Sequence, residues 1–458
     1  MSDCGAVGYV WRPHQYAHSG AEAAGVCLSA GTDLNCGSFY TNMAEAIDKG
    51  FADEKQVDQS VTRLFHARMR LGMFDPWKQQ PYLQYPPETV GHSTHSNTAL
   101  QLARESIVLL KNENETLPLR GTTLSKIAVL GPHYDSGATL CGTYHGGLPH
   151  IISPIQAIKA AFTNGQVTGM KGCDRQSNIT KDFGAAMAMA KEADVAILLM
   201  GIDTSMESEG NDRTSIALPG VQEEFIGAIA TVQKNIVIVF INGGSIDLSY
   251  AKEKFEVRAI LEAFYPGTRG GEAIADVLFG KYNPSGRLPY TVHKADFVDQ
   301  IPMSDMSMTN YPGRTYRYFS GEAVYPFGFG LSYTTFKYET EQMQTASDDN
   351  EHSGPSYRAR VTNSGDIAGD TSVLAFISFK DSETNFLCPK SQLFGFEKIH
   401  LLPGESKDMF FSASPAALRC YRSSDKSLGS PPGRYSVRIG DKLHEFYHPG
   451  HDDRVETS

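Results

Sequence analysis

The stretch ADVAILLMG at residues 193–201 decides the fold class, because it is apolar at nearly every position and ends in glycine. A run this short is typical of a strand buried on both faces, as in a parallel sheet covered by helices. Three further apolar runs of similar length are predicted as strands: 126–131, 236–242 and 259–265. Helical patterns lie between these strands or follow them: 182–192, 221–234 and 270–279. This alternation predicts an α/β layered domain.

The segment before these strands contains a predicted helix and a predicted linker. The helix covers residues 97–111, and its apolar side chains share one face: Leu100, Ala103, Ile107 and Leu110. We therefore place the α/β sandwich domain at residues 96–300. Residues 76–95 are rich in proline, glutamine and tyrosine, and this composition is typical of a linker.

Residues 1–75 show the pattern strand, helix, strand, helix. Residues 6–10 are short and apolar, as expected of a strand, and residues 22–29 are helix-like. The last helix is the clearest, because its apolar residues recur close to the 3.6-residue period: Val57, Val61, Leu64, Phe65 and Leu71. Gly72 follows as a stop signal. Two strand–helix units cannot close a core alone, so the pattern of this segment does not account for a complete domain.

The carboxyl-terminal third changes to an all-β pattern. Residues 301–335 are aromatic and glycine-rich and form a predicted connector. Short strands punctuated by turns follow it: 357–363, 372–379, 393–399, 407–413 and 433–440. This spacing predicts a β-sandwich at residues 336–448, followed by a tail at 449–458.

The composition excludes several classes of function. The net charge of -11 and the pI near 5.7 argue against a nucleic-acid-binding surface, which needs clustered basic residues. No stretch approaches the roughly eighteen apolar residues of a membrane span. The seven cysteines lack CxxC pairs and the fourteen histidines form no HExxH motif, so we expect neither a metal nor another cofactor.

A polar loop follows the strand at 193–201, at the end of the sheet where α/β domains bind ligands. It carries four acids and one arginine: Asp203, Glu207, Glu209, Asp212 and Arg213. A carboxylic acid beside other carboxylates holds its proton to higher pH and could act as a proton donor. By itself, however, the loop is more simply a solvated segment in which Arg213 pairs with an acid. Asp3, by itself, is an exposed residue near the chain terminus.

Seven motifs change this interpretation when they are considered together in their order along the chain. They are SDCGAV (2–7), AGTDLNCG (30–37), ESEGNDR (207–213), YPGTRGGEA (265–273), PSGRLP (284–289), PGRTYRYF (312–319) and YPFGFGLSYTTF (325–336). This ordered set resembles glycoside hydrolase family 3 over almost the whole chain.

The resemblance implies a fold and a catalytic pair. In that family a (β/α)₈ barrel precedes an α/β sandwich and often a fibronectin type III-like domain, so residues 1–75 are expected to be the carboxyl-terminal part of the barrel. The family's nucleophile corresponds to Asp3, and its proton donor corresponds to Glu209 in the EGNDR motif. Glu207 is the rival acid, but it lacks the following glycine of the motif. A retaining glycosidase needs these two carboxyl groups about 5 Å apart.

The residue after Asp3 bears on the substrate. Cys4 at this position resembles the β-xylosidase and α-arabinofuranosidase branch, whereas glucosidases of the family usually carry tryptophan there. Cys4 is therefore a candidate substrate-binding residue. Cys36 also resembles that branch, and we hypothesise a disulfide between Cys4 and Cys36. Two buried thiols are the alternative.

The resemblance implies a retaining β-glycosidase that removes terminal β-xylosyl, or α-arabinosyl, residues from xylo-oligosaccharides or xylan. About six of the eight barrel strands are expected to be absent from this chain, so little turnover is expected from it. One alternative is an inactive remnant that binds carbohydrate or a protein partner, and another is an exo-β-glucosidase. The number of subunits stays open.

The expected location is extracellular. The chain opens without the basic and apolar segments of a signal peptide, so this expectation rests on the resemblance and on two N-x-[ST] sequons. The sequons, at Asn114 and Asn178, are the candidate glycosylation sites.

Overall fold

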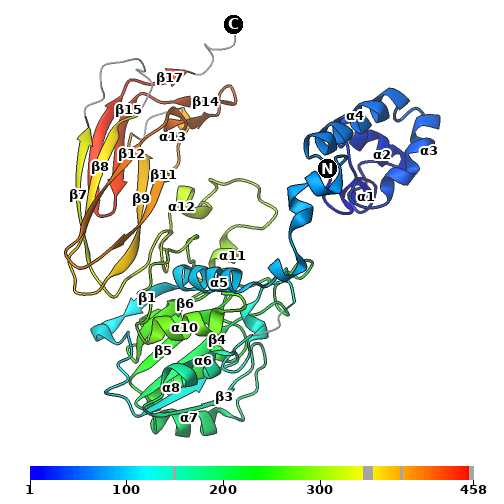
Figure 1. The fold of residues 1–458 in the computed structure, drawn as a ribbon. Helices are drawn as coiled ribbons and strands as arrows, with labels where there is room; N and C mark the ends of the chain where they lie inside the picture. Colours follow the sequence, from blue (N-terminus) through cyan, green and yellow to red (C-terminus); the bar gives the residue numbers. More distant parts are fainter. Residues whose placement is uncertain (148–150, 344–353, 382–384, 453–458) are drawn as a thin grey trace. The chain divides into compact units, whose positions relative to one another are not determined.

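The computed structural model describes residues 1–147, 151–343, 354–381 and 385–452. The chain forms two compact units, residues 1–92 and 93–458, which are described separately below. The first unit contains the helices labelled α1 to α4 in Figure 1, and the second contains all of the strands. No helix among the described residues is both long and apolar enough to cross a lipid bilayer.

The first unit is built from four α-helices and short 3₁₀ turns: α1 (Ala6–Trp11), α2 (Gly20–Ser29), α3 (Met43–Asp48), α4 (Glu54–Arg70), η1 (Phe39–Asn42), η2 (Trp77–Gln79), η3 (Pro81–Gln84) and η4 (Pro87–Thr89). Helix α4 begins with a capping box, in which Asp53 accepts a 2.8 Å hydrogen bond from the amide of Gln56 and the Gln56 side chain accepts one from Asp53. Helix α2 packs through small residues. A side chain at Gly25 would meet the carbonyl of Phe51 at 2.5 Å, so these two segments approach too closely for alanine.

Two expectations for this unit are wrong. Residues 6–10 belong to helix α1, and residues 1–92 contain no β-strand. The physical reason is that a strand needs a neighbouring strand to pair its amides and carbonyls, whereas a helix pairs them within itself. The predicted core face of α4 is also partly open, with Val61, Phe65 and Leu71 between 40% and 73% exposed. The assignment of residues 1–75 to part of a barrel rests on the resemblance and stays a prediction.

The second unit begins with an α/β domain built on a six-stranded sheet of order β1-β6-β5-β4-β2-β3. Its strands are β1 (Val108–Asn112), β2 (Lys126–Leu130), β3 (Gln166–Met170), β4 (Val195–Gly201), β5 (Ile236–Ile241) and β6 (Val257–Glu262). All neighbours are parallel except β1, which runs antiparallel to β6. Every residue of β4 and β5 is buried, because helices cover both faces of the sheet. The four predicted strands are confirmed.

Alternate residues of the central strands face two separate helical layers. Ile197 and Val239 pack with α5 (Ser93–Ser106), α6 (Pro154–Ala161) and α10 (Gly270–Leu278). Leu198 and Ile238 pack with α7 (Phe183–Lys191), α8 (Gln222–Val232) and α9 (Ser249–Glu253) on the other face. The predicted helices at 182–192, 221–234 and 270–279 are therefore confirmed as covering layers.

The predicted helix at 97–111 is confirmed only in part. Helix α5 ends at Ser106, and Val108–Asn112 forms strand β1 at the edge of the sheet. Over so short an apolar run the helical and strand patterns fit equally well, and the open edge of β6 decides in favour of a strand because it offers hydrogen-bond partners. At its other end α5 begins at Ser93, so the last three residues of the predicted linker, 93–95, belong to this helix. Neither helix α6 nor strand β3 was predicted from the sequence.

The carboxyl-terminal part of the second unit is a β-sandwich, as predicted. One sheet has the order β11-β9-β15-β16 and the facing sheet has the order β12-β8-β7. These strands are β7 (Phe336–Met343), β8 (Ser356–Asn363), β9 (Gly369–Phe379), β11 (Gln392–Leu401), β12 (Ser406–Ser412), β15 (Gly433–Ile439) and β16 (Lys442–His448). The five predicted strands are confirmed, while β7 and β16 were not predicted.

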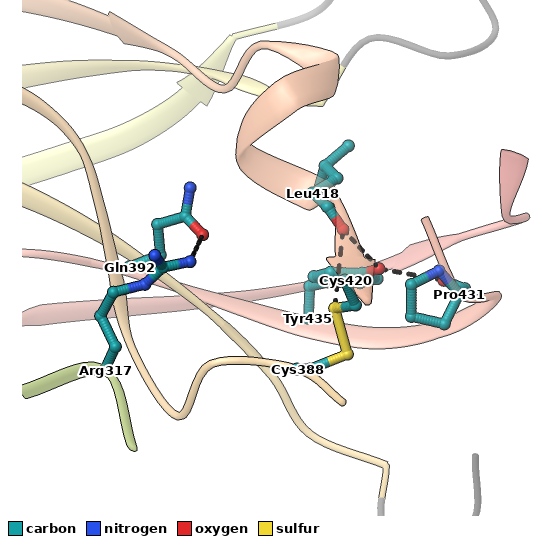
Figure 2. The surroundings of a disulfide bond; sticks show 7 residues. All are labelled: Arg317, Cys388, Gln392, Leu418, Cys420, Pro431 and Tyr435. Atoms are coloured by element: carbon teal, nitrogen blue, oxygen red, sulfur yellow. Dashed lines mark hydrogen bonds between the residues drawn. A yellow bond between two sulfur atoms is a disulfide. The ribbon is translucent and has the colours of Figure 1, made fainter. Parts of the chain in front are cut away.

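A third, small sheet of order β10-β13-β14-β17 closes the end of the sandwich. Its strands are β10 (Phe386–Leu387), β13 (Cys420–Arg422), β14 (Ser427–Ser430) and β17 (His451–Asp452). Strand β17 lies inside the predicted tail at 449–458, of which residues 453–458 are outside the described ranges. A disulfide joins Cys388 to Cys420 beside this sheet, and Tyr435 donates a 3.0 Å hydrogen bond to the carbonyl of Pro431 next to it (Figure 2).

Candidate active site

The candidate site in the second unit lies where strands β4, β5 and β6 end. The loop after β4 carries the acids selected from the sequence, the turn after β5 contains Gly243 and Gly244, and the segment after β6 contains Tyr265. Because these strands are parallel neighbours, their carboxyl ends meet at one edge of the sheet. This is the edge at which open α/β sheets bind ligands.

Glu209 lies at the tip of a tight turn. The amide of Ser208 donates to the carbonyl of Asn211 at 3.0 Å, and the amide of Asn211 donates back to Ser208 at 3.0 Å. Gly210 has φ of 74°, a left-handed conformation that glycine adopts without steric cost. The Glu209 side chain is exposed and makes no hydrogen bond or ion pair with the residues that the structure describes. It is therefore free to meet a ligand.

Glu207 has a different environment, although it is only two residues away. Its Oε1 atom accepts hydrogen bonds from the amides of Gly243 and Gly244 at 2.9 and 2.7 Å, and from the Tyr265 hydroxyl at 3.2 Å. Its Oε2 atom accepts from Arg213 Nε at 3.0 Å. Four donors therefore surround this one carboxylate. Glu207 thus ties the loop after β4 to the neighbouring turns.

From the sequence, Arg213 was expected to pair with an acid of the same loop, although the sequence did not indicate which one. Arg213 does pair with an acid, and that acid is Glu207, with both side chains largely buried. Arg213 also donates to the carbonyl of Ser245 at 3.0 Å. Asp212, by contrast, is exposed. The simple expectation of an arginine-paired loop is therefore confirmed, and it leaves Glu209 unpaired.

Asp203 anchors the start of the same loop. It is 7% exposed and forms an ion pair with Arg175, with 2.9 Å between its carboxylate and Nε. It also accepts from the amide and the hydroxyl of Ser205, at 3.0 and 2.5 Å. Asp203 and Glu207 are consequently both occupied in holding the loop.

Glu262, at the end of β6, is a buried acid that the sequence analysis did not select. It is 1% exposed, and burial raises its pKa to about 8. Its partners are neutral, namely the amide of Phe264 at 3.3 Å and the side chain of Asn242. The sequence did contain a sign of a buried acid here, because Glu262 is the one charged residue in the otherwise apolar run ILEAF at 260–264.

Asp3 belongs to the first unit, where its segment is tied to residues 34–36. The amide of Ser2 donates to the carbonyl of Leu34 at 2.8 Å, and the amide of Gly5 donates to Cys36 at 2.9 Å. The hypothesised Cys4–Cys36 disulfide is present, with 4.4 Å between the Cα atoms. Asp3 itself is exposed and accepts a 2.7 Å bond from the amide of Cys4.

The remaining sequence candidates are accessible. Cys4 is exposed and is held in the disulfide, so its sulfur is not a free thiol. Asn114 and Asn178 are both exposed, and their glycosylation stays a prediction. No group of three or more histidine, cysteine, aspartate or glutamate side chains suited to a metal occurs in the described ranges.

Comparisons with known proteins match both parts of the second unit. Residues 107–333 match the model of the glycosyl hydrolase family 3 C-terminal domain, and residues 372–442 match that of the fibronectin type III-like domain. The chain is 34% identical to β-D-xylosidase 1 of Arabidopsis thaliana, covering 97% of this chain and 61% of that protein. It is 36% identical to the probable exo-1,4-β-xylosidase bxlB of Aspergillus fumigatus, covering 96% of this chain and 58% of that protein. The chain thus spans about 60% of the length of these relatives.

The chain is also similar to solved structures of a β-xylosidase and of β-glucosidases. A family 3 exo-β-xylosidase (XlnD), in complex with a xylobiose aziridine activity-based probe, has a TM-score of 0.89 and 30% identity over 97% of this chain and 60% of its own. The β-glucosidase of Listeria innocua, in complex with isofagomine, has a TM-score of 0.83 and 26% identity over 98% of this chain and 63% of its own.

Proposed function

The chain belongs to glycoside hydrolase family 3, and from this premise we propose that it comes from a retaining β-xylosidase with Glu209 as general acid/base and Asp3 as nucleophile. The observation that carries the proposal is the contrast between the two neighbouring acids. Glu207 is saturated by four donors, whereas Glu209 is exposed and without a partner at the tip of its turn. A proton donor must reach the leaving oxygen, and of these two glutamates Glu209 has that freedom.

The chemistry requires two roles. Glu209 would protonate the departing glycosidic oxygen and later take a proton from the incoming water, while Asp3 would attack the anomeric carbon and form the glycosyl-enzyme intermediate. The disulfide and hydrogen bonds around Ser2 and Cys4 support a fixed backbone for Asp3. No cofactor takes part in this scheme.

The preference for xylose rests on the names of the relatives and on Cys4. Both curated relatives are described as xylosidases, and Cys4 stands where glucosidases of the family usually carry tryptophan. Because a xylosyl unit lacks the hydroxymethyl group of glucose, a differently shaped wall beside the sugar can separate the two. The substrate class is therefore a terminal β-xylosyl residue of an oligosaccharide or of xylan, with α-arabinosyl residues as a secondary class.

Secretion is part of the same proposal. Disulfides persist in oxidising compartments, and the described residues contain two, Cys4–Cys36 and Cys388–Cys420. The exposed sequons at Asn114 and Asn178 agree with an extracellular location.

The test is the release of nitrophenol from nitrophenyl β-xyloside, β-glucoside and α-arabinofuranoside by the purified 458-residue chain. Little turnover is expected of this chain, so the proposal predicts that whatever xyloside turnover it shows is reduced by Asp3→Asn and by Glu209→Gln, each by at least about a hundredfold. Asp212→Asn, at an exposed acid of the same loop, is the matched control and should keep its activity. Faster turnover of the glucoside would favour the exo-β-glucosidase alternative. Absence of any turnover, with binding of xylo-oligosaccharides retained, would favour the binding-module alternative.

A further inference from the structure

A cavity lies between residues of the α/β domain (289–297) and of the connector that leads to the β-sandwich (308–327). Its volume is about 510 Å³, and we call it the Arg317 pocket; its walls include Thr291, His293, Arg314, Tyr316, Arg317 and Phe327. Both of the domains that flank it belong to the second unit. A cavity of this size is within the range that holds one or two sugar rings or a small aromatic molecule.

The walls of the Arg317 pocket are aromatic and fixed in place. Tyr316 stacks on Phe327, with 4.1 Å between ring centroids, and His293 stacks on Phe297 at 3.9 Å. The edge of Phe319 closes on His293 at 4.4 Å. These contacts hold flat apolar surfaces around the cavity, to which the C–H face of a sugar or an aromatic ring can pack.

The charge of the pocket is positive. No aspartate or glutamate lines it, while two arginines do. Arg317 donates from Nη2 to the amide oxygen of Gln392 at 3.1 Å (Figure 2), and its buried Nε has no hydrogen-bond partner. Among the described residues it makes no ion pair. A half-buried guanidinium without a counter-ion is unusual, because its desolvation is not offset by an opposite charge.

The positive charge of Arg314 is only partly balanced by the groups around it. Its Nη2 donates to the carbonyls of Pro302 and Asp305, both at 3.0 Å. The carboxylate of Asp305 is occupied by the side chain of Asn310 and the amide of Ser307, both at 2.8 Å. These two bonds, and after them the Arg314 guanidinium, lower the pKa of Asp305. Burial lowers the pKa of His293 to about 4, so this side chain adds no positive charge at neutral pH.

Two uncharged polar atoms in the walls also lack partners. They are the hydroxyl of Thr291, whose side chain belongs to a residue only 7% exposed, and Nδ1 of His293. Buried polar atoms are almost always hydrogen-bonded in folded proteins. Together with Arg317 Nε, they are polar groups of the walls that the described residues leave without a partner.

We propose that the Arg317 pocket binds a small ring that carries a carboxylate, with the ring packed against the aromatic walls and the carboxylate paired with Arg317 and Arg314. A neutral ring would leave the Arg317 guanidinium without a counter-ion, and a simple anion would leave the apolar walls uncovered. Arginine suits this ligand because its planar group pairs with both oxygens of a carboxylate. Such a ring has two chemical sources, a uronic acid unit of a polysaccharide and an aromatic acid.

The test is calorimetric titration of the 458-residue chain with four probes. Methyl β-D-glucuronide and benzoate each carry a ring and a carboxylate, acetate carries the carboxylate alone, and benzyl alcohol carries the ring alone. We expect one of the first two to bind at least about tenfold more tightly than either of the others, and the better of them identifies the source. Equal binding of acetate or of benzyl alcohol would overturn the proposal, as would no binding of the first two up to about 10 mM.

Substitutions in the walls test whether the ligand binds in the Arg317 pocket. Arg317→Gln should weaken the better ligand by about tenfold or more, because it removes a charge-assisted pair. Arg360→Gln, at an exposed arginine that pairs with Asp408 on the sandwich, is the control and should bind as the wild type does. If Arg317→Gln fails to fold, Arg314→Gln and Thr291→Val take its place. Unchanged affinity in every folded pocket variant would overturn the proposal. Binding is measured without turnover, so this result does not depend on Asp3 or Glu209.

Discussion

Glu207 and Gly244 lie in loops that follow different strands, and a 2.7 Å hydrogen bond from the Gly244 amide to the Glu207 carboxylate joins them. A side chain on Gly244 would come within 2.6 Å of that carboxylate, so the bond depends on glycine at this position. Glu207 therefore anchors the loop that carries Glu209. Of the two acids of the ESEGNDR motif, Glu207 holds the loop in position and Glu209 is exposed.

Replacing Glu207 should damage stability and activity together. Glu207→Ala leaves the largely buried Arg213 without its acid and removes acceptors for two backbone amides, so unfolding should become easier by about 2–4 kcal/mol. Urea unfolding followed by circular dichroism measures this change. Glu209→Gln is the matched control, because an exposed side chain without partners should change stability by less than about 0.5 kcal/mol. Equal stability of the two variants would contradict the anchoring role of Glu207.

Gly210 should be needed for its backbone conformation alone. Its φ is 74°, and no other atom lies within 4 Å of the position that a side chain would take. Gly210→Ala should therefore cost about 1 kcal/mol through the backbone, without a steric clash. Gly184→Ala is the control: it also has open space, but it lies inside helix α7, where alanine should stabilise by about 0.5–1 kcal/mol. Opposite shifts of the melting temperature are the expected outcome.

Glu262 should make the protein less stable as the pH rises. Its pKa in the fold is about 8, above the ordinary value of 4.5, so the folded state keeps a proton that the unfolded state releases. The contribution of Glu262 to stability is therefore fully present below pH 4.5 and falls progressively up to about pH 8. Glu262→Gln should match the wild type near pH 4.5 and exceed its stability at pH 8 by more than about 1 kcal/mol. Parallel stability curves for the two proteins across this range would contradict it.

The Cys4–Cys36 disulfide should support the first unit. The two residues are 32 apart in sequence, and loss of a cross-link over a loop of this size costs about 3 kcal/mol. Cys36→Ser should lower the melting temperature of the first unit, and dithiothreitol should do so in the wild type. Cys27→Ser, at a half-buried free cysteine, is the control and should respond to dithiothreitol as the wild type does. Peptide mapping without reduction should recover Cys4 linked to Cys36 and Cys27 as a thiol.

Most of the fold followed from local pattern. The strands β2, β4, β5 and β6 are recognisable because a strand buried on both faces must be apolar throughout. The β-sandwich strands alternate in exposure, and turns separate them. The failures occurred where a partner elsewhere in the chain decides the conformation. Val108–Asn112 became a strand because β6 offered an open edge, and residues 6–10 became helical where no strand was present to pair with them.

For the candidate site, the sequence by itself led to the proposal of Asp3 and Glu209 as the catalytic pair, because their motifs resemble those of the family. It also selected Cys4 and Cys36 as a bonded pair, and the structure contains that disulfide. Only the tertiary structure decided that Glu207 is held by Gly243, Gly244 and Arg213 while Glu209 stays free. The physical reason is that a hydrogen bond between loops depends on which strands are neighbours in the sheet, and no local pattern in the sequence records that pairing.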